Sequence, residues 1–379
     1  MASAPIGPDE SRRLLELARS DREAASAALA RLPVDDQLAV VCSAPPARRA
    51  ALLALLPDPE ALIPRLPEAE LVFTVKAVGL HDAGWILACA TSEQIIAGLD
   101  LDAWRGYEVD ADTLGEWIAS LAEADQQALV RAARALDPEL LVIYLRHRLL
   151  VVQKPDDDPG WQPPDQAQTL EGQFYFVTRD EGDDAEAVVA LLRGLFDEDY
   201  WTYFRLMQGA IWELDSDTEE WALRWRTGRL QDLGFPPWDE AMGIYRFIAP
   251  EDRARVPEAE QALDVDAWKL PVWLPSLPDA ASSEHRVFRA IAALAGDERR
   301  AAYYAFVAVA NKIAVADRMP LSDVESTPRA IEKAARFISD GIAHVGAEHG
   351  LTDVDVLRRL TLERLFGIGA NLDPLSARP

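Results

Sequence analysis

Short apolar runs between prolines fill roughly the first 150 residues of the chain, and the clearest runs cover residues 47–56 and 69–78. The prolines recur about every dozen residues, at Pro33, Pro45, Pro46, Pro57 and Pro67. Proline ends a helix at the residue before it and is tolerated in the first turn of the next helix. The pattern therefore predicts successive helices of two to three turns. Because helices this short are unstable alone, we expect them to bury their apolar faces in an α-solenoid-like stack.

Polar residues predict where several of these helices begin. In a capping box, a hydroxyl and a carboxylate or amide each satisfy a backbone N–H of the first helical turn. The required spacing occurs at Ser20 with Glu23, and at Thr91 with Gln94. Further along, Asp137 followed by Pro138 predicts an N-cap with proline in the first turn, for a helix over residues 138–152.

A change of composition divides the chain. Residues 154–168 contain four prolines, four aspartates and a glycine, which is typical of a surface linker. We therefore expect an N-terminal helical stack over 1–153, a linker over 154–168 and a second helical lobe over 169–379. Phe174–Thr178 is aromatic and β-branched and predicts a short strand, with residues 272–274 as a candidate partner. The expected fold is all-α with at most a minor β-hairpin.

Residues 196–250 form the centre of the second lobe and read as three helices. The first, over about 198–214, has a predicted apolar face made of Tyr200, Phe204, Met207, Ile211 and Leu214. A capping box of Ser216 and Glu219 predicts the start of the second helix, which runs to about Arg229. Pro236 and Pro237 start the third helix, which ends before Pro250.

The C-terminal part returns to long helices. Residues 301–316 are apolar nearly all round, which predicts a buried central helix. Asn311, Lys312 and Asp317 interrupt this helix, either as a polar network or as a stripe that faces solvent. Thr327 followed by Pro328 predicts the start of a helix that reaches about residue 345. A last helix is expected over residues 353–366.

The chain of 379 residues is strongly acidic, with a formal net charge of −26. Affinity for nucleic acid comes mainly from Lys and Arg that neutralise phosphates, so nucleic acid and anionic membrane surfaces are unexpected partners. No apolar run reaches the roughly 20 residues needed to span a membrane. Cys42 and Cys89 lie in apolar helical stretches, which favours free thiols in a reducing cytoplasm.

The candidate interaction residues lie in the acidic segment 155–260, which has 25 Asp or Glu, nine Arg and no Lys. Trp221 and Trp225 are i,i+4 neighbours on its second predicted helix, and Arg224 lies between them. Trp and Arg dominate interface hot spots, so this cluster could bind a peptide. The alternative is that the indoles are core and the arginines pair with nearby carboxylates. The complete set of candidates is Trp221, Arg224, Trp225, Arg229 and Trp238.

A calcium loop is excluded by its own spacing. Asp215, Asp217 and Glu219 resemble the first ligands of an EF-hand. The sixth position is Glu220 where the turn needs glycine, and the twelfth is Arg226 where a bidentate glutamate belongs.

Other catalytic and ligand-binding motifs fail in the same way. His344 and His349 are five residues apart, so a helix would place them about 140° apart rather than on one face. Gly367 and Gly369 lack the third glycine of a dinucleotide fingerprint and are interpreted as a helix C-cap after residue 366. The sequence has no P-loop and no nucleophile elbow.

Two resemblances add to this interpretation. The segments RLPVDDQLAVV, SAPPARRAALLALLP and RLPEAELVFTV resemble the helical repeats in the cytoplasmic N-terminal domain of MgtE-type magnesium transporters, over about residues 20–145. That resemblance implies a right-handed stack of short helices. The segments FTVKAVGL, ALRWRTGRLQDLGFPPWDEAMGIY and VANKIAVADRMPL are similar to an uncharacterised bacterial family of helical proteins, which implies no activity.

The sequence therefore favours a non-enzymatic cytoplasmic scaffold that binds a protein partner, with no cofactor. One alternative is a sensor in which acidic helix faces bind Mg²⁺ or Ca²⁺ and change the packing of the two lobes. A second alternative is an enzyme with a polar pocket that no motif reveals.

Overall fold

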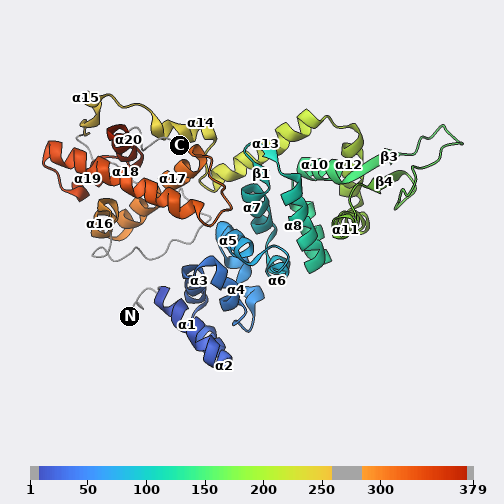
Figure 1. The fold of residues 1–379 in the computed structure, drawn as a ribbon, viewed down its shortest axis with the longest axis horizontal. Coiled ribbons are helices and arrows are strands. Elements are labelled where there is room, and N and C mark those ends of the chain that lie inside the picture. The colour runs from blue at the N-terminus through green and yellow to red at the C-terminus, as the bar shows by residue number, and fades with distance from the viewer. Residues whose placement is uncertain (1–7, 258–283, 374–379) are drawn as a thin grey trace. The chain divides into compact units, whose positions relative to one another are not determined.

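The computed structural model describes residues 8–257 and 284–373, and it is predominantly helical, as expected (Figure 1). The strands in these residues make two small antiparallel pairs. Contacts within the chain divide it into two compact units, Arg12–Arg229 and Leu230–Pro379, the second of which also takes in Met1–Ser11. We describe each unit by itself. Segment 154–168, the expected linker, lies inside the first unit.

The described chain opens with short helices, which belong to the first unit from Arg12 onward. They are α1 (Pro8–Ser20), α2 (Arg22–Ala30), α3 (Val34–Ser43), α4 (Pro46–Leu53), the 3-10 helices η1 (Pro59–Ala61) and η2 (Ile63–Arg65), α5 (Glu68–Val78), α6 (Gly84–Cys89) and α7 (Ser92–Asp102). A two-residue strand pair, β1 (Trp104–Arg105) and β2 (Glu108–Val109), leads to α8 (Ala111–Ala124), α9 (Gln126–Ala135) and α10 (Pro138–Arg148). The unit is completed by β3 (Leu149–Gln153), β4 (Phe174–Thr178), α11 (Asp183–Glu198), α12 (Tyr200–Trp212) and α13 (Asp215–Asp232).

Prolines and capping residues separate these helices much as the sequence predicts. The capping box of Thr91 and Gln94 is present at the start of α7. The box predicted for Ser20 and Glu23 is wrong: Asp21 caps α2 by accepting from the backbone N–H of Ala24. The hydroxyl of Ser20 instead donates to a carbonyl at the end of α1. Aspartate is as good an N-cap as serine, so the sequence did not show which of Ser20 and Asp21 begins the helix.

The predicted helix over 138–152 ends early. It stops at Arg148, and the apolar residues after it form β3, which pairs antiparallel with β4 from Leu149↔Thr178 to Gln153↔Phe174. The strand over Phe174–Thr178 is confirmed, and residues 272–274, its candidate partner, lie outside the described residues. Segment 154–168 connects β3 to the region before β4, where Gln168 bridges Phe176.

The apolar face expected for α12 is partly correct, since Met207 is fully buried and Phe204 is partly buried, but the buried face also includes residues that were not expected. Tyr203, Leu206 and Met207 are fully buried, while Leu214 lies beyond the helix end and is 65% exposed. The packing reason is the hairpin: Phe204 contacts Phe174 of β4, and the Tyr203 hydroxyl donates to Glu171 at 2.7 Å.

The capping box predicted for the next helix is also wrong. Helix α13 begins at Asp215, so Ser216 lies inside its first turn. The hydroxyl of Ser216 donates to Asp217 and does not cap the helix.

The second unit contains α14 (Trp238–Ala241), η3 (Met242–Tyr245), α15 (Pro250–Arg253), α16 (Arg286–Ala293), α17 (Gly296–Ala316), α18 (Ser326–His349), α19 (Asp353–Arg359) and α20 (Leu362–Leu372). Its core forms around α17, α18 and α20, with Phe306, Phe337 and Phe366 buried. The buried central helix predicted over 301–316 is therefore confirmed within α17.

Two helix ends in this unit correct the sequence interpretation. The single helix expected over 353–366 is interrupted, because Thr361 caps a new helix, α20. Gly367 and Gly369 lie inside α20 and are not a C-cap. A Cβ atom at Gly369 would overlap the carbonyl oxygen of Phe337, so glycine is needed where α20 crosses α18.

Further boundaries differ by a few residues. The helix expected from Pro236 to before Pro250 is reduced to α14 and η3. Helix α18 begins at Ser326, so Thr327 lies inside its first turn, and the helix continues to His349.

The polar residues of α17 are divided between two roles. Asp317 accepts from the Tyr245 hydroxyl at 2.7 Å and pairs with Lys333 at 2.6 Å, so a buried network is present. Lys312 pairs with Glu363 at 2.9 Å, and Asn311 is 9% exposed and takes no part in the Asp317 network.

Candidate interaction surface

Helix α13 has two different faces. Thr218, Ala222, Arg226 and Arg229 follow one another at three- and four-residue spacing and are buried or partly buried. Residues with this spacing share one helix face, which here packs on the rest of the unit. Trp221 and Trp225 lie at the edge of this face and Arg224 lies on the far side, and all three are exposed.

The packed face is fixed by an ion cluster around Arg229. Its guanidinium binds Asp100 through Nε–Oδ2 at 2.7 Å and Nη2–Oδ1 at 2.9 Å. It also binds Asp137 through Nη1–Oδ1 at 2.9 Å and Nη2–Oδ2 at 2.7 Å. The planar guanidinium of Arg229 therefore forms a bidentate ion pair with each of the two carboxylates. Asp137 precedes α10 but makes no side-chain cap there, because both of its oxygens serve Arg229.

The electrostatics of the cluster favour the charged arginine. Burial alone would lower the pKa of Arg229, but hydrogen bonds and charge from Asp100 and Asp137 outweigh it and raise the pKa. Arg226 donates to the carbonyl of Asp100 at 2.8 Å and lies over the Trp104 ring at 4.9 Å. Burial lowers the pKa of Arg226 to about 10, because it has no carboxylate of its own. Helix α13 is thus attached through partly buried arginines rather than through an apolar stripe.

Two exposed indoles lie at the edge of the packed face of α13. Trp221 and Trp225 stack with ring centroids 6.1 Å apart and an interplanar angle of 27°. They are 44% and 48% exposed, so the alternative that both are core is wrong. Arg224 places its guanidinium carbon 5.0 Å from the centre of the Trp221 ring. Arg224 makes no ion pair with any described residue, and its contact with the indole is a cation–π interaction.

Carboxylates flank this pair. Asp217 lies one turn before Trp221, and Glu220 lies one turn before Arg224, and both are exposed. Neither carboxylate forms an ion pair within the described part of the chain. We call Asp217, Glu220, Trp221, Arg224 and Trp225 the outer face of α13.

The five predicted interaction residues are therefore not one cluster. Trp221, Arg224 and Trp225 lie together on the outer face, whereas Arg229 belongs to the packed face. Trp238 lies in the second unit, where its Nε1 donates to the carbonyl of Ala316 at 3.2 Å and Arg318 covers its ring at 5.0 Å. The expectation that the arginines pair with carboxylates is correct for Arg229 alone among these residues.

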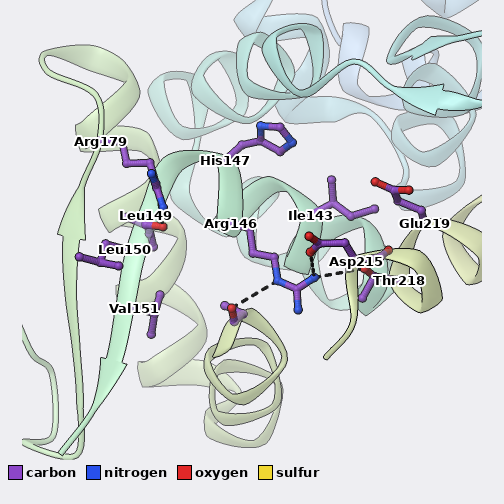
Figure 2. A pocket seen from close by; sticks show the side chains of 11 residues that line it. Ile143, Arg146, His147, Leu149, Leu150, Val151, Arg179, Asp215, Thr218 and Glu219 are labelled. Atoms are coloured by element: carbon purple, nitrogen blue, oxygen red, sulfur yellow. Dashed lines mark hydrogen bonds and ion pairs between the residues drawn. The ribbon is translucent and has the colours of Figure 1, made fainter. Parts of the chain in front are cut away.

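A pocket lies on the first unit, beside the corner between α12 and α13 (Figure 2). Its volume is about 410 Å³. It is lined by Ile143, Arg146, His147, Leu149, Leu150, Val151, Arg179, Ala210, Asp215, Thr218 and Glu219. Figure 2 shows the β3 residues on one side and the α13 residues on the other.

Arg146 closes one wall of this pocket and was not singled out by the sequence. It donates to the carbonyls of Gly209 at 2.8 Å, Ala210 at 3.3 Å and Glu213, all at the end of α12. It also pairs with Asp215 at 2.6 Å, at the start of α13. A cation is favourable at the carbonyl end of a helix, so Arg146 stabilises the corner between the two helices. No sequence signal pointed to it, because its partners are more than 60 residues away.

Further exposed aromatics were missed as well. Trp201 is 76% exposed and Trp212 is 67% exposed, on the helix preceding the outer face. The sequence feature that could have identified them is their position in an acidic, tryptophan-rich segment.

Residues 8–257 and 284–373 contain no group of three or more His, Cys, Asp or Glu that could hold a metal ion. Among the helices formed by these residues, none is long and apolar enough to cross a membrane.

Comparison with known proteins places the chain in a family. Residues 26–373 match a family of unknown function, DUF6178, and the chain belongs to it. No curated protein and no solved structure matches the chain.

Proposed function

We propose that this chain is a non-enzymatic protein-interaction scaffold and that the outer face of α13 is its docking surface. The observation that carries the proposal is the stacked pair of Trp221 and Trp225, each nearly half exposed. Large aromatic side chains gain most from being buried, and Trp and Arg are enriched among the residues that dominate binding energy. Trp221, Trp225 and Arg224 therefore have the composition of an interface hot spot.

The attachment of α13 supports this assignment. Because Arg229 and Arg226 hold the packed face through buried contacts, the indoles contribute little to that attachment. The side chains of this surface are also ordered before a partner binds, since the two rings are stacked and Arg224 covers one of them. Groups that are ordered before binding lose less conformational entropy when a partner docks.

A cytoplasmic setting belongs to the same proposal. Cys42 and Cys89 are both free thiols. Free thiols without a disulfide are typical of reducing compartments.

The test is capture of partners from native lysate with the immobilised full chain. We expect wild type to retain specific partners and the double variant Trp221→Ala/Trp225→Ala to lose them. Trp85→Ala is the matched control, because Trp85 is 38% exposed but lies on α6. Urea unfolding should give the double variant a free energy of unfolding within about 0.5 kcal/mol of the wild-type value. Equal capture by the double variant, or no specific capture by wild type, would refute the proposal.

The other functional expectations stay predictions. A specific site for Mg²⁺ or Ca²⁺, as the sensor alternative requires, would raise the unfolding midpoint in a saturable way at millimolar cation. The resemblance of residues 20–145 to the MgtE cytoplasmic domain motivates that measurement. The enzyme alternative has no further observation in its favour.

A further inference from the structure

Strand β3 has one edge that pairs with no other strand of the described residues. In antiparallel pairs, hydrogen-bonded positions alternate with positions that direct their N–H and C=O away from the partner strand. Arg179 N donates to Arg148 O at 2.8 Å, and Lys154 N donates to Gln173 O at 2.8 Å. These two bonds fix the alternation, so Leu149, Val151 and Gln153 direct their backbone groups away from β4.

Only the first of these three residues has its outward groups occupied. The N–H of Leu149 donates to Leu145 O, and its carbonyl accepts from Arg179 Nε at 3.1 Å. Within the described residues, nothing is hydrogen-bonded to the outward N–H or C=O of Val151 or Gln153. Two donors and two acceptors therefore stand in a row, which is the arrangement that pairs with a further strand.

The pocket opens beside this edge (Figure 2). Leu149 and Val151 line one side of it, and Thr218 and Glu219 of α13 line the opposite side. Its volume of about 410 Å³ lies within the range of pockets that hold ligands. Leu150, on the other face of the strand, is 46% exposed.

We propose that this edge binds an extended, basic segment of a partner protein, which adds to the β3–β4 hairpin as a third strand. In this mode of recognition, main-chain hydrogen bonds give affinity and alternate side chains give specificity. The proposal is independent of the outer face of α13, because it uses other residues and another kind of contact.

The negative charge of the chain favours a basic partner. Within the pocket, Arg146 pairs with Asp215, while Glu219 and Arg179 form no ion pair with a described residue, so the lining itself is close to neutral and the selection comes from the charge of the whole chain. The whole chain carries −26, so a second copy of it would be repelled and a chain rich in Lys or Arg would be attracted. Apolar side chains at alternate positions of the partner share one face of the sheet, and on the pocket side they would meet Val151.

The test uses a fluorescein-labelled octapeptide of alternating Lys and Val, titrated with the full-length protein and followed by fluorescence anisotropy. A peptide of alternating Glu and Val tests the charge, and a peptide of alternating Lys and Pro tests the main-chain donors. We expect saturable binding of the Lys-Val peptide alone. Equal binding of the Lys-Pro peptide would overturn the proposal, because attraction between charges would then explain the affinity.

Proline variants test the edge itself. Val151→Pro removes one outward N–H but no bond of the β3–β4 ladder, and proline is tolerated at such edge positions. We expect Val151→Pro and Gln153→Pro each to weaken binding about tenfold. Thr178→Pro is the matched control, because its N–H points outward from the opposite edge of the hairpin. Unchanged affinity in both edge variants, or an equal loss in Thr178→Pro, would overturn the proposal.

Hydrogen exchange on the wild-type protein gives a readout that needs no variant to fold. The amides of Val151 and Gln153 should exchange more slowly with the Lys-Val peptide, and unchanged exchange would count against the proposal. Light scattering tests the competing occupant: a dimer that Val151→Pro dissociates would show that a second copy covers the edge. Trp221→Ala/Trp225→Ala should bind the peptide as wild type does, which separates this result from the proposed function.

Discussion

Arg229 and Asp100 form a bidentate ion pair that joins the end of α13 to the last turn of α7. Both carboxylate oxygens are used, at 2.7 and 2.9 Å, and the Asp100 side chain is 1% exposed. A charge excluded from water in this way is retained only when its partner stays in place. The pair therefore determines which face of α13 packs, and Trp221 and Trp225 are left exposed at the edge of that face.

Substitution of Arg229 should lower the urea concentration at which the first unit unfolds. We expect Arg229→Ala to lower the free energy of unfolding by about 3 kcal/mol, because Asp100 would remain buried without its counter-ion. This value is the lower end for a broken buried pair, since the Arg229 side chain is 30% exposed. Urea unfolding followed by circular dichroism measures the change.

Arg224 provides the matched control for Arg229. It lies on the same helix but pairs with no described carboxylate, so Arg224→Ala should change the stability by less than about 0.5 kcal/mol. A loss of similar size in both variants would contradict the assignment of the two faces.

Glycine at a helix crossing gives the second prediction. A Cβ atom at Gly341 of α18 would overlap the carbonyl oxygen of Leu365 in α20, and backbone cannot move aside as a side chain can. Gly341→Ala should therefore destabilise the second unit by about 1–3 kcal/mol, in spite of the better helix propensity of alanine.

The control for this substitution lies on α13. Gly228 is exposed, and a Cβ there would meet nothing within 4 Å. Gly228→Ala should stabilise the protein by about 0.5–1 kcal/mol. Thermal unfolding of both variants checks the opposite signs, and a stabilised Gly341→Ala would show that α18 and α20 can move apart.

Local signals were sufficient for much of the fold. Proline positions and apolar periodicity predicted a helix over 69–78 where α5 covers Glu68–Val78, and β-branched composition predicted Phe174–Thr178 as a strand. In both cases the information lies within about ten residues. The strand nature of Leu149–Gln153 was missed, because an apolar run that follows a helix reads as its continuation until β4 is brought beside it.

The candidate site was harder, because its organisation depends on distant residues. Trp221 and Trp225 were found from composition, but no apolar stripe on α13 told which face is buried. That face is held by Arg229, whose partners Asp100 and Asp137 lie 129 and 92 residues away. Gly369 was interpreted as a helix end for the same reason, since the contact with Phe337 that requires glycine is absent from the local sequence.

The third prediction concerns pH and the start of α12. Asp199 accepts from the backbone N–H of Thr202 at 3.2 Å and from its hydroxyl at 2.9 Å, and Arg134 lies 3.3 Å away. The backbone hydrogen bond from Thr202 is the main reason why the pKa of Asp199 is lowered. A lowered pKa means that the ionised form stabilises the fold above the unfolded-state value of about 3.9, and that this contribution is lost as pH falls through the folded-state pKa.

Asp199→Ala should therefore cost about 1 kcal/mol at pH 7, the usual value for an N-cap aspartate. The difference between variant and wild type should begin to shrink as pH falls below about 4, and it should vanish once pH is below the folded-state pKa of Asp199, where wild type also lacks the carboxylate charge. Urea unfolding at pH 7 and pH 3 measures it. A difference that is as large at pH 3 as at pH 7 would show that the charge of Asp199 is not what stabilises α12.

The two thiols should differ in reactivity, which gives the fourth prediction. Cys42 is 6% exposed, and burial, reinforced by the Glu70 charge, raises its pKa to about 12. Cys89 is partly exposed, and burial together with the Glu60 and Asp58 carboxylates raises its pKa by less. Since the thiolate is the reactive form, Cys89 alone should react with a disulfide reagent in the folded protein. Its rate should rise about tenfold per pH unit below its pKa.

Single cysteine variants separate the two thiols. Cys42→Ser should keep one reactive thiol in the folded state, whereas Cys89→Ser should show none until denaturant unfolds the first unit. Colour development with a thiol reagent at pH 8, with and without urea, gives the count directly. Rapid reaction of folded Cys89→Ser would mean that α3 opens readily, because a buried thiol with so high a pKa can react only after it reaches water.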